Sequence, residues 1–75
     1  MTDQPLIIRD QDILGGTPVF AGTRVPVQTL LDYLAAGDTL DAFLEDFPTV
    51  SRAHATAVLE FAKQMLLTYS YENTA

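Results

Sequence analysis

The sequence predicts a mostly α-helical α+β fold, in which a short N-terminal β-ribbon packs on a helix-turn-helix-like core of three helices. Glycine and proline gather in one early segment between short β-prone runs, which is typical of a ribbon. Apolar residues then recur at helical spacing in three segments separated by turn residues. We therefore expect a single domain over residues 1–75, with a tail at 1–5, the ribbon over 6–27, the trihelical core over 28–68 and a frayed tail over 69–75.

The ribbon is predicted by the aliphatic run at residues 6–8 and by the segment GGTPVFAGTRVPV at residues 15–27. Gly16 and Gly22 are expected at tight turns with positive φ, a conformation that other residues adopt at a cost. The two prolines of the segment lack an amide donor, which confines its strands to sheet edges. We expect two or three short strands, which must pack on helices or pair with a second copy because an isolated ribbon is marginally stable.

The first two helices are predicted from their apolar spacing and their ends. The first runs from Gln28 to Gly37, where a glycine in the left-handed conformation ends it. Thr39 is the expected N-cap of the second helix, and Asp41 in the first turn favours the positive end of the helix dipole. Pro48 stops this helix.

The third helix is expected to be the longest and to begin after Ser51 as N-cap. Phe61 widens its apolar stripe and is expected in the core, so that its truncation would unfold the chain. Three helices of this size match a helix-turn-helix unit, although many three-helix bundles without a nucleic-acid role share the pattern. The stripe itself comprises Ala55, Val58, Leu59, Ala62, Met65, Leu66 and Tyr69.

Composition predicts association with another protein. A core in a chain of 75 residues contributes only about 3–5 kcal/mol, and the absence of cysteine excludes disulfides as a supplement. Association with another chain is the remaining source of stability, so we expect a homodimer or an obligate partner. The formal charge of −6 opposes nonspecific attraction to nucleic acid or anionic lipid and suits a basic protein partner.

The same composition argues against membranes and against catalysis. No apolar run reaches the ~18 residues of a membrane span, and the N-terminus lacks a secretory signal, so we expect a cytoplasmic protein without a membrane partner. Ser51 and His54 lie three residues apart, but capping accounts for the serine. His54, the sole histidine, is expected to be solvated at the helix surface. We predict no enzyme, no cofactor, no metal site and little room for a pocket.

A family resemblance comes from specific residues across most of the chain, from about Ile8 to Leu66. The residues that carry it are Gly15-Gly16, Pro18, Gly22-Thr23-Arg24-Val25-Pro26-Val27, Gly37, Phe47-Pro48 and Phe61-Ala62. With these residues the sequence resembles the bacterial family called domain of unknown function 433. Acidic residues often occur early in the third helix of that family, where this chain has Ala53 and His54. The resemblance implies a homeodomain-like or winged helical core and an antitoxin-like role, with PIN-like ribonuclease toxins as partners.

We interpret the glycine-rich and proline-rich segment as a scaffold and as part of the dimer seam. Arg24 is expected to tie loop carbonyls or a carboxylate such as Asp32, since its donors have a fixed geometry; contact with a phosphate is the alternative. The structural and dimer set comprises Gly16, Pro18, Phe20, Gly22, Arg24, Val25 and Pro26.

Two functions remain open. The primary prediction is an antitoxin-like module that neutralises a PIN-like ribonuclease, because acidic side chains steer a basic partner and a tyrosine-bearing tail can order on it. The predicted partner-binding residues are Asp41, Glu45, Asp46, Tyr69 and Tyr71.

The alternative is a helix-turn-helix transcriptional regulator of its own operon, with operator DNA as partner and the start of the third helix in the major groove. Its predicted DNA-binding residues are Ser51, Arg52, His54 and Thr56. Arg52 is the sole cation in this set, so few phosphate contacts are available. Charge therefore favours the protein-binding module.

Overall fold

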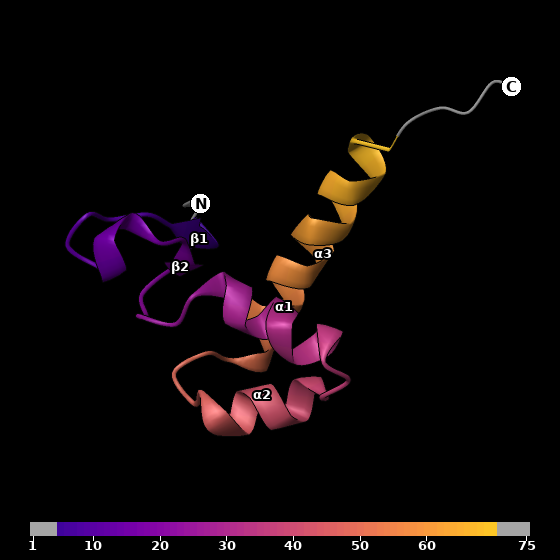
Figure 1. Ribbon diagram of the computed structural model, residues 1–75, viewed down its shortest axis with the longest axis horizontal. Coiled ribbons are helices and arrows are strands. Elements are labelled where there is room, and N and C mark those ends of the chain that lie inside the picture. Colours follow the sequence, from indigo (N-terminus) through magenta and orange to yellow (C-terminus); the bar gives the residue numbers. More distant parts are fainter. Residues whose placement is uncertain (1–4, 71–75) are drawn as a thin grey trace, which may run out of the picture.

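The structure, a computed structural model, describes residues 5–70 and confirms a mostly α-helical α+β fold (Figure 1). Two short strands and a single 3-10 turn form the N-terminal part, and three α-helices follow. The elements in chain order are β1 (Ile7–Ile8), η1 (Leu14–Gly16), β2 (Val19–Phe20), α1 (Val27–Ala35), α2 (Leu40–Asp46) and α3 (Arg52–Thr68).

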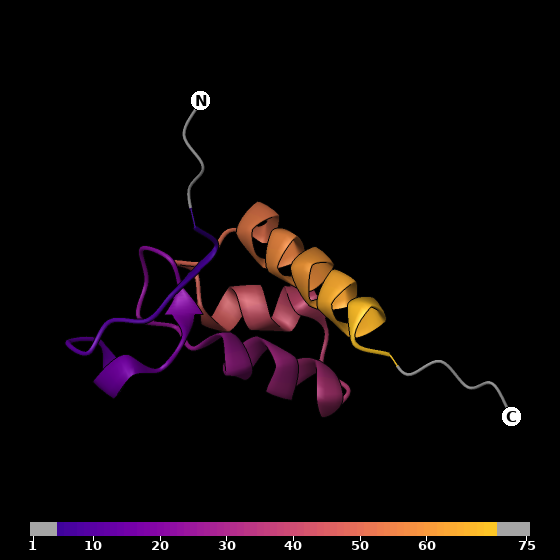
Figure 2. The ribbon, with the colours of Figure 1, turned by 90° about the horizontal axis from the view of Figure 1, so that it is seen from above.

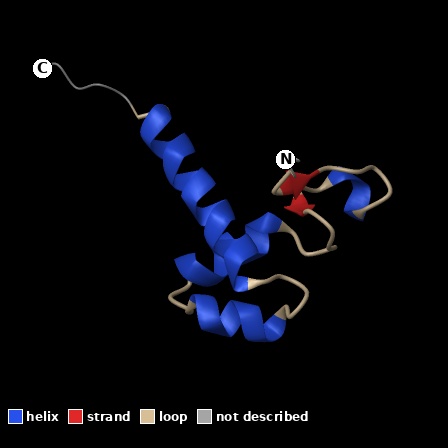
Figure 3. Ribbon diagram, turned by 180° about the vertical axis from the view of Figure 1, so that it is seen from behind, coloured by secondary structure: helices blue, strands red, loops and turns tan. Residues whose placement is uncertain are grey.

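The β-ribbon is an antiparallel pair in which Ile7 lies opposite Phe20. An isolated antiparallel bridge also links Val19 of β2 to Pro26, which follows the turn. Gly22 turns the chain after β2 with a φ of 81°, which confirms the predicted positive φ; Gly16 has a φ of 95°. Figure 3 shows the two strands at one end of the molecule, next to the short turn η1.

The helix ends confirm the predicted local signals. The Thr39 hydroxyl accepts a hydrogen bond from the Ala42 amide at 3.0 Å. The Ser51 hydroxyl accepts from the His54 amide at 3.0 Å. Gly37 follows α1 with a φ of 93°. Side-chain capping satisfies amides that the first helical turn leaves unpaired, so α2 and α3 begin where the sequence predicts.

The core lies where the ribbon meets the three helices. Phe20 from β2 and Phe43 from α2 are both fully buried, with ring centroids 5.9 Å apart. Phe43 also contacts Phe47 and Tyr33, whose ring centroids lie 5.1 Å and 5.5 Å from its own. The buried apolar residues of the described chain are Val19, Phe20, Val25, Leu30, Phe43, Val50, Ala55 and Val58.

The second half of α3 differs from the prediction. Ala55 and Val58 are buried, but Phe61 is 50% exposed and Leu66 is 74% exposed. Figure 1 shows the reason: α3 continues well beyond α1 and α2, so its later turns have no core to pack against. Figure 2 shows the three helices from above. The expectation that Phe61 fills the core is therefore wrong. Within residues 5–70, the structure contains no helix with the length and apolarity required to cross a bilayer.

Candidate functional site

The start of α3 and the start of α2 meet through an ion pair. The Arg52 guanidinium donates a hydrogen bond to the Asp41 carboxylate, and both side chains are largely exposed. A residue predicted to read DNA thus contacts a residue predicted to bind a protein. Ser51 and Thr56 are exposed beside this pair, and the Ser51 hydroxyl is occupied by the cap of α3.

His54 is not the solvated surface residue that we expected. Its Nε2 lies 2.9 Å from the carbonyl oxygen of Leu6, to which it donates. Its ring meets Phe20 edge-on, with centroids 5.2 Å apart. The side chain is half-buried, and it joins α3 to the chain just before β1. The sequence offered no signal for this contact, because the partner is a backbone carbonyl 48 residues away.

The carboxylates of α2 differ in what they contact. Asp46 accepts a hydrogen bond from the Tyr33 hydroxyl at 2.6 Å. This bond raises the pKa of the Tyr33 phenol above its usual value of 10.0, with smaller contributions from desolvation and from the charges of Asp46 and Asp38. Glu45 is exposed and has no hydrogen bond or ion pair within residues 5–70. Asp41 and Glu45 lie four residues apart and therefore on one face of the helix.

One of the two tyrosines that we predict to bind a partner lies within the described residues. Tyr69 follows the last turn of α3 and is 73% exposed. Tyr71 lies outside the described residues. The exposure of Tyr69 continues that of Leu66 and Leu67 on the preceding turn, which are 74% and 64% exposed.

The glycine-rich and proline-rich segment is built around a threonine. The Thr23 hydroxyl donates to the Phe20 carbonyl oxygen at 2.8 Å and accepts from the Val25 amide at 3.0 Å. A threonine hydroxyl that bonds to nearby backbone groups is typical of a turn, so Thr23 is a residue from which this turn could have been predicted. Phe20 and Val25 themselves are buried in the core.

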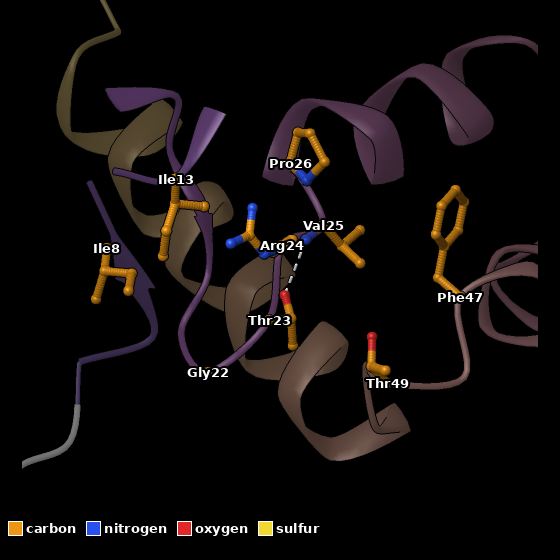
Figure 4. A pocket seen from close by; sticks show the side chains of 9 residues that line it. All are labelled: Ile8, Ile13, Gly22, Thr23, Arg24, Val25, Pro26, Phe47 and Thr49. Carbon is orange, nitrogen blue, oxygen red and sulfur yellow. Dashed lines mark hydrogen bonds between the residues drawn. The ribbon is translucent and has the colours of Figure 1, made fainter. Parts of the chain in front are cut away.

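Arg24 corrects our expectation of a structural tie. Its side chain is exposed and makes neither an ion pair nor a hydrogen bond within the described part of the chain. It borders an open hollow of about 660 Å³, shown in Figure 4. Its walls are mostly apolar and come from Ile8, Ile13, Gly22, Thr23, Arg24, Val25, Pro26, Phe47 and Thr49.

Comparison with known proteins identifies the family of this small α+β domain. A family model described as protein of unknown function (DUF433) matches residues 7–62. The chain therefore belongs to that family, as its glycine-rich and proline-rich segment predicted.

The chain is also similar to part of a longer curated protein. The chain is 44% identical over 45 residues to an uncharacterized protein, y4eO, of Sinorhizobium fredii (strain NBRC 101917 / NGR234). The match covers 60% of this chain and 20% of the relative, so the chain spans about a fifth of that protein's length. No solved structure matches the chain.

Proposed function

We propose that the chain is an antitoxin-like protein-binding module that neutralises a PIN-like ribonuclease. The observation that carries the proposal is the Arg52–Asp41 ion pair. Residues 38–56 contain four carboxylates and one arginine, and that arginine is already paired. This region therefore presents excess negative charge on α2 and on the residues just before it.

A ribonuclease is a suitable partner for this acidic surface. An enzyme that binds RNA holds the phosphate backbone with lysine and arginine side chains. Carboxylates on α2 can occupy the same cations, and opposite charges on two surfaces accelerate association. The choice of a PIN-like nuclease comes from the family resemblance, whereas the acidic surface supports a basic partner of any kind.

The test combines capture with inhibition. The tagged chain is used to recover its partner from the host, and the partner's cleavage of single-stranded RNA is then measured with and without purified chain. We expect inhibition that saturates at a fixed stoichiometry. Glu45→Gln should weaken inhibition, and Asp12→Asn, which removes an exposed carboxylate of the ribbon, should leave it unchanged. Full cleavage at saturating chain would refute the proposal.

DNA binding is the second candidate, favoured by the exposure of Ser51, Arg52 and Thr56 at the start of α3. His54 no longer belongs to the reading set in this proposal, because its ring is held by Leu6. Fluorescence anisotropy with the chain's own promoter DNA tests it. Arg52→Ala should weaken binding. It should also reduce, by about one, the magnitude of the slope of the logarithm of the binding constant against the logarithm of the salt concentration. Unchanged affinity in this variant would exclude α3 as the reading helix.

A further inference from the structure

The apolar face of α3 continues beyond the core that covers its first half. Ala55 and Val58 face the core, and Ala62, Met65, Leu66 and Tyr69 follow on the same side, each three or four residues from another member of this face. The exposed fractions of Met65, Leu66 and Tyr69 are 36%, 74% and 73%. Phe61, 50% exposed, borders the same face. We call these four side chains, Phe61, Met65, Leu66 and Tyr69, the overhang.

The overhang carries no charge, because the polar residues of this part of α3 lie on the opposite side. Glu60 and Lys63 form an ion pair there, with 3.0 Å between the Lys63 Nζ and the Glu60 carboxylate. Gln64 and Thr68 share that side, and the Thr68 hydroxyl donates to the Gln64 carbonyl oxygen at 2.8 Å. The helix is therefore amphipathic over turns that have no intramolecular partner.

We propose that a second copy of this chain covers the overhang, so that the dimer seam lies on α3 and not on the ribbon. In a two-fold dimer the same surface meets itself, and a chain with a formal charge of −6 can do this only where its surface is uncharged. A basic partner, by contrast, gains charge complementarity at α2 and none at the overhang. This inference stands whether or not the partner at α2 is a ribonuclease.

The overhang supplies part of the area that a standard dimer interface requires. At roughly 200 Å² for each large side chain, the overhang exposes about 450 Å². Each partner contributes about 800 Å² to a standard interface, so the overhang supplies more than half of it. Leu67, 64% exposed, lies on the side of Glu60 and Lys63 and adds nothing to this area.

An antiparallel arrangement of two α3 helices uses the whole overhang. With the two-fold axis at Met65, Phe61 of one copy lies opposite Tyr69 of the other, since each is four residues from the axis. An apolar hollow of about 270 Å³ lies beside Phe61 and is lined also by Pro5, Leu6 and Ile7. A side chain from the second copy's α3 can enter it, so each copy offers both a projecting helix and a hollow.

Sedimentation equilibrium over a range of chain concentrations tests the proposal. We expect a dimer for the natural sequence and, for Leu66→Glu, a dissociation constant raised about tenfold or more, because the two-fold axis places two carboxylates in the interface. The high exposure of Leu66 leaves the fold of the variant intact, which far-UV circular dichroism checks. Gln64→Glu adds the same charge on the opposite side of the helix and should dimerise normally.

A matched substitution on the ribbon distinguishes the two positions of the seam. Leu14 on η1 is 51% exposed, so Leu14→Glu repeats the same chemical change away from α3 and should not affect dimerisation. Dimers lost with Leu14→Glu but kept with Leu66→Glu would overturn the proposal, as would a natural chain that stays monomeric up to millimolar concentration.

Salt dependence separates this interface from the one at α2. Added salt screens the repulsion between two acidic copies, so the dimer should tighten or hold its affinity as ionic strength rises. Binding of a basic partner at α2 should weaken over the same range. A dimer that dissociates steadily with added salt would place charged groups in the interface and overturn the proposal.

Discussion

The imidazole of His54 shows how one side chain can hold a small domain together. It bonds the Leu6 carbonyl oxygen and packs edge-on against Phe20, so it joins α3 to β2 and to the residue that precedes β1. A hydrogen bond of this kind contributes about 1 kcal/mol, and an edge-on aromatic contact adds about 0.5–1.5 kcal/mol. For a domain whose total stability is small, this is a large share.

His54→Ala should therefore lower the free energy of unfolding by about 1–3 kcal/mol. Urea denaturation followed by circular dichroism measures this loss. Thr56→Ala is the matched control, because it truncates an exposed residue on the same helical turn. Equal stability of the two variants would contradict a structural role for the imidazole.

The Tyr33 phenol reports on its bond to Asp46. Because the folded state raises the pKa of this group above 10.0, its contribution to stability is complete below that pH and is lost as the pH rises through the folded pKa. Titration by tyrosinate absorbance, with Tyr33→Phe to assign the signal, measures the shift. Asp46→Asn should lower the pKa of Tyr33 toward its usual value; an unchanged titration would contradict this assignment.

At the scale of the element, the turn between β2 and α1 depends on the Thr23 hydroxyl. Thr23→Val keeps the shape but leaves the Phe20 carbonyl oxygen and the Val25 amide without this partner. We expect a loss of about 1–3 kcal/mol in the free energy of unfolding. Thr49→Val, at an exposed hydroxyl on the rim of the same hollow, should be neutral in thermal denaturation.

The elements also show which features a sequence can predict. The caps of Thr39 and Ser51 were predicted because a capping hydroxyl and its amide lie three residues apart. The overhang was not, because helical spacing reveals an apolar face but not where the rest of the core ends. His54 was missed for the same reason: its contact joins residues 48 positions apart. Local chemistry is readable from the chain, and the outcome of distant packing is not.

For the whole molecule, Asp41→Asn separates the two proposed functions. The substitution releases Arg52 from its ion pair and removes one negative charge from the chain. Ribonuclease binding should weaken because α2 becomes less acidic, whereas DNA affinity should rise because a cation becomes available at the start of α3. Parallel inhibition and anisotropy measurements on this one variant decide between them; a change of both affinities in the same direction would contradict this account of the charges.

The bond between His54 and Leu6 also has a consequence for the order of folding. Helices α1, α2 and α3 are joined by short turns, so their mutual contacts form between nearby parts of the chain and close quickly. The ribbon reaches α3 only after a loop of 48 residues is closed. The entropic cost of closing this loop therefore opposes the last step of folding. The helices should thus assemble first and the ribbon should dock late. Weakening the docking contact should accelerate unfolding far more than it slows folding.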